Sequence, residues 1–515
     1  MNKKMSKKIG VSEHVLVLLL GTLIVYGILA VTGTIHSGYH FLDDHELIRL
    51  QIGFEQHGAP LGLSIKNWIL NDFWWRYRPL YWVERVTGAY FWGSELLYWN
   101  IYTAIKGVIT FYCLYFMARY LKYGKVISAI VPCIVMLGSQ FTPWYRSANQ
   151  ESTGLLLCAM ALCLSAAQGY YKKYTDWRYN VPIVIFAVLA GLTKESFTLF
   201  MPAFIAFKFW LEYWDEDCAV TGKARLLKCL KSNIITYGII LLGMLINVCV
   251  IMFYVGVDNV SYAGFQEGVS LSAYVYGIKS SLTQYTRWYT LIGALIVLLV
   301  VVCYKNIEKK DITRYCGLAL IGGYICGVQL VAHAKSGMWE RYIIPYIIGY
   351  VFIFVLLAYR IFEKDRIHKL VFYGILFLLL YENVPVAYAN AVSYTDNGRS
   401  VNSFLEGVKE NTSETDEIIC AFADEELNLA TECWLEANER TQTYSLVNNE
   451  WKNEVQLLGT APEEFSGLNA NALVCYEWQI EDMLPLMGIA DERQYVVYHF
   501  DGYSLVIRSK SNGDV

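Results

Sequence analysis

Long apolar runs recur along most of the chain, separated by short polar segments. Eleven runs cover residues 13–35, 94–118, 126–141, 152–170, 181–193, 196–212, 233–255, 289–304, 313–332, 341–359 and 368–388. A helix needs about twenty apolar residues to cross a bilayer, and several runs are shorter. The pattern predicts an all-α polytopic membrane protein of about eleven transmembrane helices. The run 181–193 is the weakest, so 181–212 is either two spans or one broken helix.

The pattern changes near residue 393, where the chain takes on ordinary polarity. Strand-like pieces lie at 417–422, 472–478, 494–500 and 503–509, and helix-like pieces lie at 424–440 and 480–488. Such alternation is typical of a small α/β domain. We therefore expect a membrane domain over 1–392, with a long outer loop at 36–93, and a soluble domain over 393–515.

The positive charges predict an orientation for these spans. With the N-terminus in the cytoplasm, the predicted cytoplasmic segments hold 23 Lys and Arg, whereas the four short outer loops hold six. This asymmetry follows the positive-inside rule, provided that 181–193 and 196–212 are separate spans. The C-terminal domain is then extracytoplasmic. The first apolar stretch is too long for a cleaved signal, and without retention signals a bacterial plasma membrane is expected.

Composition supports the membrane assignment and narrows the function. Charged residues make up 17% of the chain and aromatic residues 15%, with 40 Tyr and 15 Trp. Soluble chains carry roughly 25% charged residues, and Tyr and Trp favour the membrane boundary. The net charge of −4 indicates no nucleic-acid partner. No metal-ligand spacing connects the 13 cysteines, and no phosphate-binding glycine loop is present.

Candidate chemistry starts in the long outer loop. Asp43 and Asp44 follow the first span, and this pair could share a cation or, alternatively, cap a helix. Further on, Arg76 and Arg78 lie in the aromatic segment NDFWWRYRPLYW. Guanidinium groups suit a lipid phosphate, although snorkelling arginines of an interfacial segment would give the same pattern.

Further charged residues lie in the other predicted outer loops. These are Arg146, Lys194, Glu195, Lys335 and Arg341. Ionisable residues at membrane depth are costly and mark candidate sites. The alternative for Lys194 and Glu195 is that they pair with each other in a short loop. Lysine and arginine are disfavoured on this side of a membrane, so topology alone does not explain them.

This set of residues suits the transfer of a sugar from a polyprenyl phosphate to a hydroxyl. The leaving group is already an anionic phosphate, so it needs cations and no general acid. The acceptor hydroxyl needs one carboxylate base. Glycosidases, whose leaving group is an alkoxide, need two carboxylates.

At these residues the chain resembles the GT-C superfamily of polyprenyl-phosphate-sugar glycosyltransferases, most closely the protein O-mannosyltransferase branch. The matching pieces are LDDHELI, NDFWWRYRPLYW, FWGSELLYWNIYTAIKGVITFYCLYFMARYL, GLTKES and ERYIIP, in this order. The resemblance implies an inverting enzyme of the membrane. Its tail shows no 34-residue helical repeat, unlike the tetratricopeptide-bearing members, so the acceptor could be a protein, a cell-wall glycan or a lipid-linked glycan.

The resemblance also implies roles for the candidate residues. Asp43 and Asp44 would supply the base and could hold a divalent cation, Mg or Mn. The residues that would contact the lipid phosphate or the substrate are Arg76, Arg78, Arg146, Lys194, Glu195, Lys335 and Arg341.

Three other functions fit the same pattern. A flippase or transporter for a lipid-linked glycan would place charges at mid-depth and on both sides. A polysaccharide polymerase would use a lipid diphosphate-linked oligosaccharide instead of a monophosphate sugar. A non-catalytic anchor would not need eleven spans.

Overall fold

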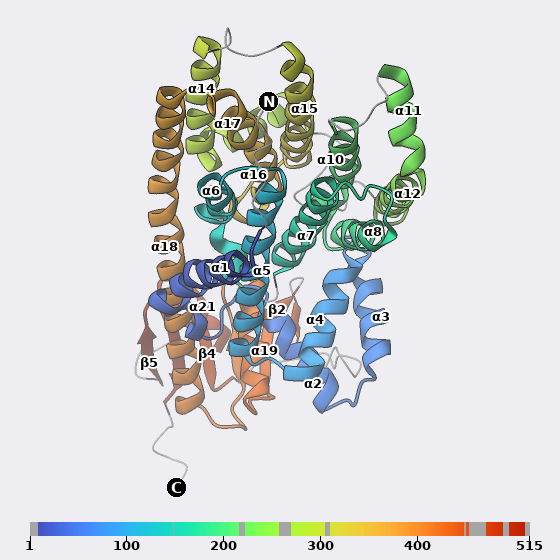
Figure 1. Ribbon diagram of the computed structural model, residues 1–515. Helices are drawn as coiled ribbons and strands as arrows, with labels where there is room; N and C mark the ends of the chain where they lie inside the picture. Colours follow the sequence, from blue (N-terminus) through green and yellow to red (C-terminus); the bar gives the residue numbers. More distant parts are fainter. Residues whose placement is uncertain are drawn as a thin grey trace. The chain divides into compact units, whose positions relative to one another are not determined.

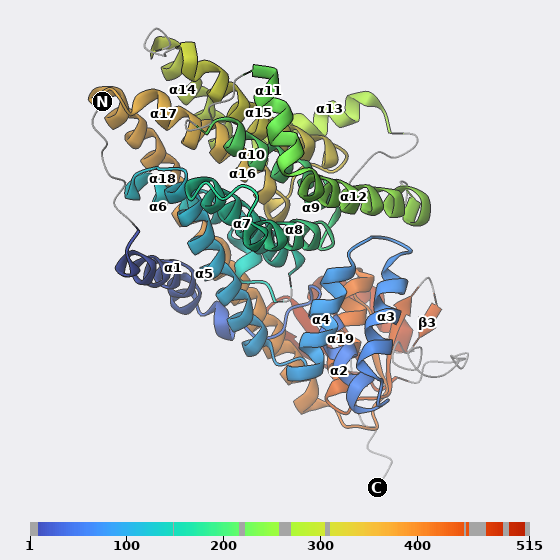
Figure 2. The same cartoon turned by 45° about the vertical axis from the view of Figure 1, so that its right-hand side comes forward.

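The computed structural model describes residues 9–147, 149–215, 222–256, 269–303, 309–447, 450–452, 470–487 and 494–509. The chain divides into two compact units (Figures 1 and 2). The first, here the helical unit, comprises Met1–Thr32, Trp68–Trp82 and Asn100–Ala391. The second, here the sheet unit, comprises Gly33–Asn67, Val83–Trp99 and Val392–Val515.

Every apolar run predicted from the sequence coincides with a helix. The helices are α1 (Val11–Thr32), α5 (Leu96–Tyr120), α6 (Lys125–Met136), α7 (Gln150–Tyr170), α8 (Trp177–Gly191), α9 (Glu195–Thr198), α10 (Met201–Tyr213), α11 (Gly222–Ser232), α12 (Ile234–Val250), α13 (Leu271–Ser280), α14 (Arg287–Cys303), α15 (Lys309–Ala332), α16 (Ile344–Tyr350), α17 (Ala358–Phe362) and α18 (Arg366–Asn411). Short π-helical segments, η3 (Ile251–Gly256), η5 (Ser281–Tyr285) and η8 (Val351–Leu357), continue α12, α13 and α16. The 3₁₀ helices of this unit are η2 (Ser139–Trp144) and η7 (Glu340–Tyr342).

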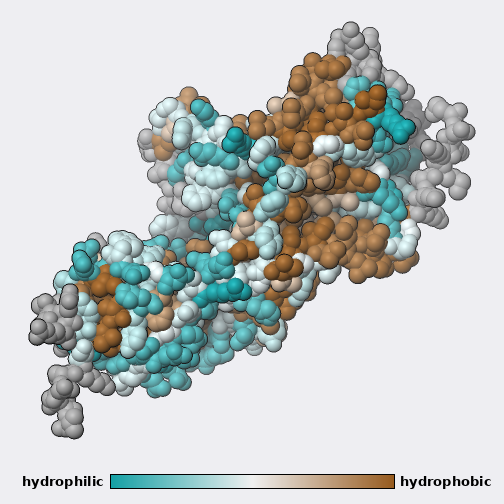
Figure 3. All heavy atoms as spheres, turned by 90° about the vertical axis from the view of Figure 1, so that its left-hand side faces the viewer, coloured by the Kyte–Doolittle hydropathy of each residue, from teal (hydrophilic) through white to brown (hydrophobic). Residues whose placement is uncertain are grey.

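Among the described residues, seven helices are long and apolar enough to cross a membrane, or eight if the pair Leu271–Tyr285 and Arg287–Val302, bent by 86°, is one span. Helices α6, α8 and α10, with 12, 15 and 13 residues, are shorter than a full crossing. Apolar side chains gather on the outside of the helical unit (Figure 3). The chain is a multi-pass membrane protein, as its hydropathy predicts.

The weak region 181–212 is not one continuous helix. Helix α8 ends at Gly191, the four-residue helix α9 follows, and α10 begins at Met201. Lys194 lies in the extended connection before α9. The break therefore places the ionisable pair of the TKES segment between two apolar helices, where the polar backbone of a broken helix is tolerated.

The long loop 36–93 folds into helices. It contains the 3₁₀ helix η1 (Thr34–His36), α2 (His45–Glu55), α3 (Leu61–Asp72) and α4 (Pro79–Trp92). Helices α3 and α4 each have residues in both compact units. Helix α2 packs on α19 (Glu425–Ala437) of the C-terminal segment. Part of the loop thus belongs to the compact unit that also holds 392–515.

The sheet unit is built on a mixed six-stranded sheet in the order β3-β2-β1-β4-β6-β5. Its strands are β1 (Ile418–Cys420), β2 (Thr443–Val447), β3 (Glu450–Lys452), β4 (Ala472–Tyr476), β5 (Tyr495–Phe500) and β6 (Tyr503–Arg508). β1 pairs in parallel with β2 and β4, and the other pairs are antiparallel. Two further short 3₁₀ helices, η9 (Glu477–Gln479) and η10 (Leu484–Met487), flank α21 (Ile480–Met483). The predicted α/β domain with its four sequence-visible strands is confirmed.

Both faces of this sheet are covered, because successive apolar side chains of its buried strands lie on opposite faces. Ile418 and Cys420 face one core with α2, α18 and α19, whereas Ile419 faces a second core with α21 and η10. Strands β2 and β3 were not predicted, since β3 is only three residues long and β2 has polar flanks. Their pairing with β1 and with each other defines them as strands.

Candidate active site

Lys194 is a fully buried ammonium group in the connection between α8 and α9. Its Nζ lies 2.5 Å from Oε1 of Glu151, and the two side chains are 1% and 3% exposed. Nζ also lies 3.8 Å from the centre of the Tyr342 ring. A buried charge needs an opposite charge and polar neighbours, which these two residues supply. Burial lowers the pKa of Lys194 to about 8; Arg341 acts in the same direction and Glu151 opposes it.

Tyr342 lies against two cations and a histidine. The Arg341 guanidinium is 5.2 Å from the centre of its ring, and the His333 ring stacks on it at 5.1 Å. His333 is buried, and neither ring nitrogen has a hydrogen-bond partner among the residues that the structure describes. Burial, helped by Lys194, lowers the pKa of His333 to about 3, so this ring is neutral at pH 7. Glu151, Lys194, His333, Arg341 and Tyr342 are here named the Lys194 cluster.

A close helix contact brings Glu151 and Lys194 together. Glu151 lies in the first turn of α7, where its backbone N–H donates to the Asn149 side chain at 2.8 Å. One turn further, Gly154 leaves room for the Phe197 ring of α9, because a Cβ at this position would lie 2.2 Å from that ring. The glycine therefore permits the approach of the two helices that carry the ion pair.

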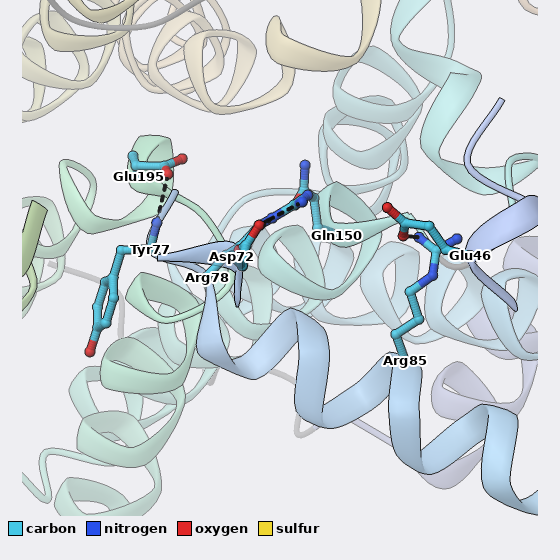
Figure 4. A network of polar contacts seen from close by, with 7 residues as sticks. All are labelled: Glu46, Asp72, Tyr77, Arg78, Arg85, Gln150 and Glu195. Atoms are coloured by element: carbon cyan, nitrogen blue, oxygen red, sulfur yellow. Dashed lines mark hydrogen bonds and ion pairs between the residues drawn. The ribbon is translucent and has the colours of Figure 1, made fainter. Parts of the chain in front are cut away.

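A second network fixes the segment between α3 and α4 (Figure 4). Arg78 grips Asp72 with two nitrogens, at 2.9 and 3.0 Å, and its third donates to Gln150 at 2.8 Å. Such a fork is the strong geometry for an arginine and a carboxylate. Burial raises the pKa of Asp72, and Arg78 opposes this shift. Since Gln150 directly precedes Glu151, Arg78 ties this segment to the start of α7.

Glu195 faces the same segment. Its Oε1 accepts a hydrogen bond from the Tyr77 backbone N–H at 3.3 Å (Figure 4). Its Oε2 is buried and has no hydrogen-bond donor among the described residues. Burial raises the pKa of Tyr342, and the half-buried Arg76 is one of the cations that oppose this, so Arg76 acts on the Lys194 cluster.

A lysine inside α5 also reaches the start of α7. Lys106 is 3% exposed, its Nζ donates to Oγ1 of Thr153 at 2.9 Å, and it lies 4.5 Å from the centre of the Tyr102 ring. A buried cation within an apolar helix is costly and is a functional-site candidate.

Two other predicted residues lie in the neighbouring connections. Arg146 is half-buried after η2, and its charge opposes the raised pKa that burial gives Glu340. Lys335 is half-buried in the turn after α15. Neither residue takes part in the contacts of the Lys194 cluster given above.

The acidic pair lies in the sheet unit, directly before α2. Asp43 is half-buried with a left-handed backbone (φ 65°), and its carbonyl oxygen accepts from Arg85. Arg85 is 2% exposed and also pairs with Glu46 at 3.0 Å (Figure 4). Asp44 is buried, and its Oδ2 accepts the backbone N–H of His40 at 3.0 Å. Its side chain makes no helix-capping hydrogen bond, contrary to the simpler interpretation as a cap.

The cation predicted at Asp43 and Asp44 stays a prediction. Within the described parts of the chain, no group of three or more His, Cys, Asp or Glu side chains could hold a metal ion. Mg²⁺ takes six oxygen ligands in a near-ideal octahedron, so two carboxylates would leave most positions to water or substrate. No chemical step is therefore assigned to a cation.

Comparison with known proteins bears on the fold. No protein-family model matches the chain, and no curated protein matches it in sequence. The crystal structure of ArnT from Cupriavidus metallidurans bound to undecaprenyl phosphate is similar, with a TM-score of 0.51 over 95% of this chain and 97% of that chain. The fold is GT-C-like. At 10% sequence identity the similarity concerns the fold alone, and the resemblance to the O-mannosyltransferase branch stays a prediction.

The structure brings some of the predicted site residues together. Lys194 and Arg341 lie in loops that are far apart in the sequence, and both contact the Tyr342 ring. Arg78 and Glu195 hold one segment, 72–78, from two sides. The ion pair that the structure shows for Lys194 is with Glu151, whereas the alternative was a pair with Glu195.

Several residues of these networks were not among the predicted site residues, among them the charged residues Asp72, Arg85 and Lys106. Lys106 carried a visible signal, a single lysine inside a long apolar run. Asp72 could have been paired with the arginine six positions later, whereas nothing in the sequence identified Arg85 as buried.

Proposed function

We propose that this protein is a membrane glycosyltransferase that moves a sugar from a polyprenyl-phosphate carrier to a hydroxyl acceptor on the extracytoplasmic side. The observation that supports it most is the GT-C-like fold, shared with a protein bound to undecaprenyl phosphate. The Lys194 cluster adds a buried cation, Lys194, and a half-buried one, Arg341, close to the ends of apolar helices. A carrier phosphate needs such groups next to a membrane.

The carrier phosphate is assigned to Lys194 and Arg341, with Arg76 in support. Lys194 is an ammonium below about pH 8, and Arg341 keeps its charge at every physiological pH. As the sugar leaves, negative charge grows on the bridging phosphate oxygen, and preorganised cations stabilise it best at low dielectric. Glu151 orients Lys194, and both cations lie beside the uncharged Tyr342 ring.

The base is assigned to Asp43. Its left-handed backbone is uncommon for a residue with a side chain, and such conformations cluster at functional sites. Arg85 holds its carbonyl oxygen, which makes Arg85 a positioning residue. Asp44 has a structural role, because its carboxylate is buried and accepts a hydrogen bond from the His40 backbone N–H.

The reaction is then a single displacement. The acceptor hydroxyl oxygen attacks the anomeric carbon while its proton passes to the Asp43 carboxylate. The bond from the anomeric carbon to the phosphate oxygen breaks, and the polyprenyl phosphate leaves with both electrons. One displacement inverts the anomeric configuration. The sugar is not specified, and the acceptor is a protein, a cell-wall glycan or a lipid-linked glycan.

Purified protein, incubated with undecaprenyl-phosphate sugars and candidate acceptors, tests this function. We expect transfer with release of undecaprenyl phosphate, and a loss of about 10²–10⁴-fold in kcat for Asp43→Asn, the usual effect of removing a general base. Lys125→Gln, which removes an exposed cation outside the site, is the matched control.

Three outcomes separate the alternatives. Elongation from a lipid diphosphate-linked oligosaccharide, with no use of the monophosphate donor, would indicate a polymerase. Movement of the intact lipid-linked glycan between leaflets without transfer would indicate a flippase. Full transfer by Asp43→Asn would remove this residue from the mechanism.

A further inference from the structure

A second polar site lies at the other end of the helical unit. It is a cavity of about 420 Å³ lined by the last residues of α5 and α7, Tyr120 and Tyr170, by α10, by α15 and by the turn after α17. The Lys194 cluster lies near the opposite end of α7, at Glu151. The 21 residues of α7 span about 31 Å, so the two sites are separate.

Basic side chains dominate the wall of this cavity. Of the described residues, five basic ones line it (Lys122, Lys172, Arg314, Arg360 and Lys364), against two acidic ones, Asp215 and Glu363. Each acidic side chain is already paired with a lining cation. Lys172 lies 3.4 Å from Asp215, and Arg360 lies 3.2 Å from Glu363. The part of the wall that the structure describes therefore carries three positive charges in excess.

Two of the lysines hold an unfavourable backbone. Lys122 (φ 66°) and Lys172 (φ 56°) each lie two residues after the end of a helix, α5 and α7 respectively. The next residue in each case bonds back into the helix: the Tyr123 N–H to the Ala118 carbonyl, and the Lys173 N–H to the Gln168 carbonyl. Glycine is the usual residue at this position, because a side chain costs free energy there.

Orientation in the membrane and helix dipoles favour cations at these helix ends. Neither effect requires a lysine in the left-handed backbone conformation of Lys122 and Lys172, since exposed neighbours such as Lys125 and Lys173 already supply positive charge. Neither explains why both strained lysines line one cavity. The ammonium group of Lys122 also has no ion-pair or hydrogen-bond partner among the described residues.

Aromatic side chains complete the wall. Trp210, Trp214 and Tyr174 line it, and the Trp210 indole donates to the Arg314 carbonyl at 2.9 Å while Arg314 lies 5.9 Å from that ring. Cations beside Trp and Tyr, at the end of apolar helices, match the boundary where lipid headgroups lie.

We propose that this cavity binds the phosphate of an anionic glycerophospholipid headgroup, held by Lys122 and Lys172. The site is distinct from the one assigned to the polyprenyl carrier and does not depend on that assignment. Its excess charge suits one phosphate, and the aromatic rings border the glycerol portion. Because Lys172 is shared with Asp215, ligand phosphate and carboxylate compete for the same ammonium group.

Native mass spectrometry of the full chain, released from nanodiscs containing phosphatidylglycerol and phosphatidylcholine, tests this. The variant Lys122→Gln/Lys172→Gln should retain about tenfold less phosphatidylglycerol than the parent protein. The matched control is Lys125→Gln/Lys173→Gln, which makes the same charge change within three residues of Lys122 and Lys172 but outside the residues that line the cavity. We expect the control to retain phosphatidylglycerol as the parent does.

If both double variants lose phosphatidylglycerol equally, the effect comes from overall charge and the proposal is overturned. Equal retention of phosphatidylglycerol in both would overturn it as well. A further arm uses sn-glycerol 3-phosphate in lipid-free detergent. If it binds at Lys122 and Lys172 as tightly as phosphatidylglycerol, the ligand is a soluble phosphate and the lipid assignment fails. The melting temperatures of the two double variants are compared as well. If Lys122→Gln/Lys172→Gln melts at the temperature of the control, loss of phosphatidylglycerol reflects lost binding and not misfolding.

Discussion

Replacing Lys194 by glutamine should separate the structural from the functional role of its ion pair. Lys194 and Glu151 are 1% and 3% exposed, so water screens their charges very little. Removing one partner of such a pair leaves an uncompensated buried charge and costs about 3–5 kcal/mol. In Lys194→Gln/Glu151→Gln both charges are gone and the two amides can hydrogen-bond. The double variant should then lie within about 1 kcal/mol of the parent protein.

The two single variants together should cost about 6–10 kcal/mol, so the double-mutant cycle predicts a coupling free energy of about 5–10 kcal/mol. Unfolding free energies of the four proteins, measured in the same detergent, give this number. Binding of undecaprenyl phosphate should behave differently. It should fall in Lys194→Gln and stay low in the double variant, because the carrier phosphate has lost its ammonium contact.

Two results would refute this reasoning. A coupling near zero would mean that the buried pair is not intact in the protein. Recovery of carrier binding together with stability in the double variant would mean that Lys194 supports the fold and does not contact the phosphate.

Four further predictions follow from the same contacts. Lys194 loses its proton as the pH rises through about 8, so the affinity for undecaprenyl phosphate should fall by up to about tenfold per pH unit above this value. Lys194→Arg should abolish this pH dependence of binding, and a pH dependence that persists in the variant would implicate another group. Gly154→Ala would press a methyl group into the Phe197 ring and should lower the free energy of unfolding by about 1–3 kcal/mol and reduce transfer. Gly323→Ala on α15, where a Cβ would meet nothing within 4 Å, should leave stability unchanged or raise it. Equal effects of the two substitutions would contradict the close approach of the helices at Gly154. Lys122→Gly and Lys172→Gly should each stabilise the protein by about 0.5–1 kcal/mol through relief of the left-handed backbone, seen as a higher melting temperature in lipid-free detergent; destabilisation would show that the lysines are structural. If Asp43 and Asp44 hold a divalent cation, EDTA should abolish transfer and Mg²⁺ or Mn²⁺ should restore it, whereas transfer within about twofold in EDTA would remove the cation from the mechanism.

The helical architecture could be predicted because apolar runs leave few alternatives in a membrane. Each of the eleven runs is helical, and even the break in 181–212 was visible in the TKES segment. Helix α18 was predicted to end near residue 388 but continues to Asn411. Hydropathy marks only the apolar part of a helix, whereas the backbone continues into polar surroundings wherever nothing stops it. Strand β3 was missed for the opposite reason, since its pairing partner and not its own pattern defines it.

The candidate site was predictable only in part. Lys194 and Arg341 stood out because cations on that side of a membrane lack a topological reason. Arg85 did not, because it lies in an amphipathic helix. Glu151 stands at the start of an apolar helix, but its pairing with Lys194 is seen only in the structure. Burial decides which charged residues matter, and burial depends on contacts between segments more than forty residues apart, such as 151 and 194.

The most direct test of the proposed function is to identify the prenyl lipid that co-purifies with the protein, by mass spectrometry of its head group. We predict a polyprenyl monophosphate, free or carrying a single sugar, that is retained by the parent protein and lost in Lys194→Gln/Arg341→Gln. A diphosphate-linked oligosaccharide, or a monophosphate retained equally by the variant, would contradict the assignment.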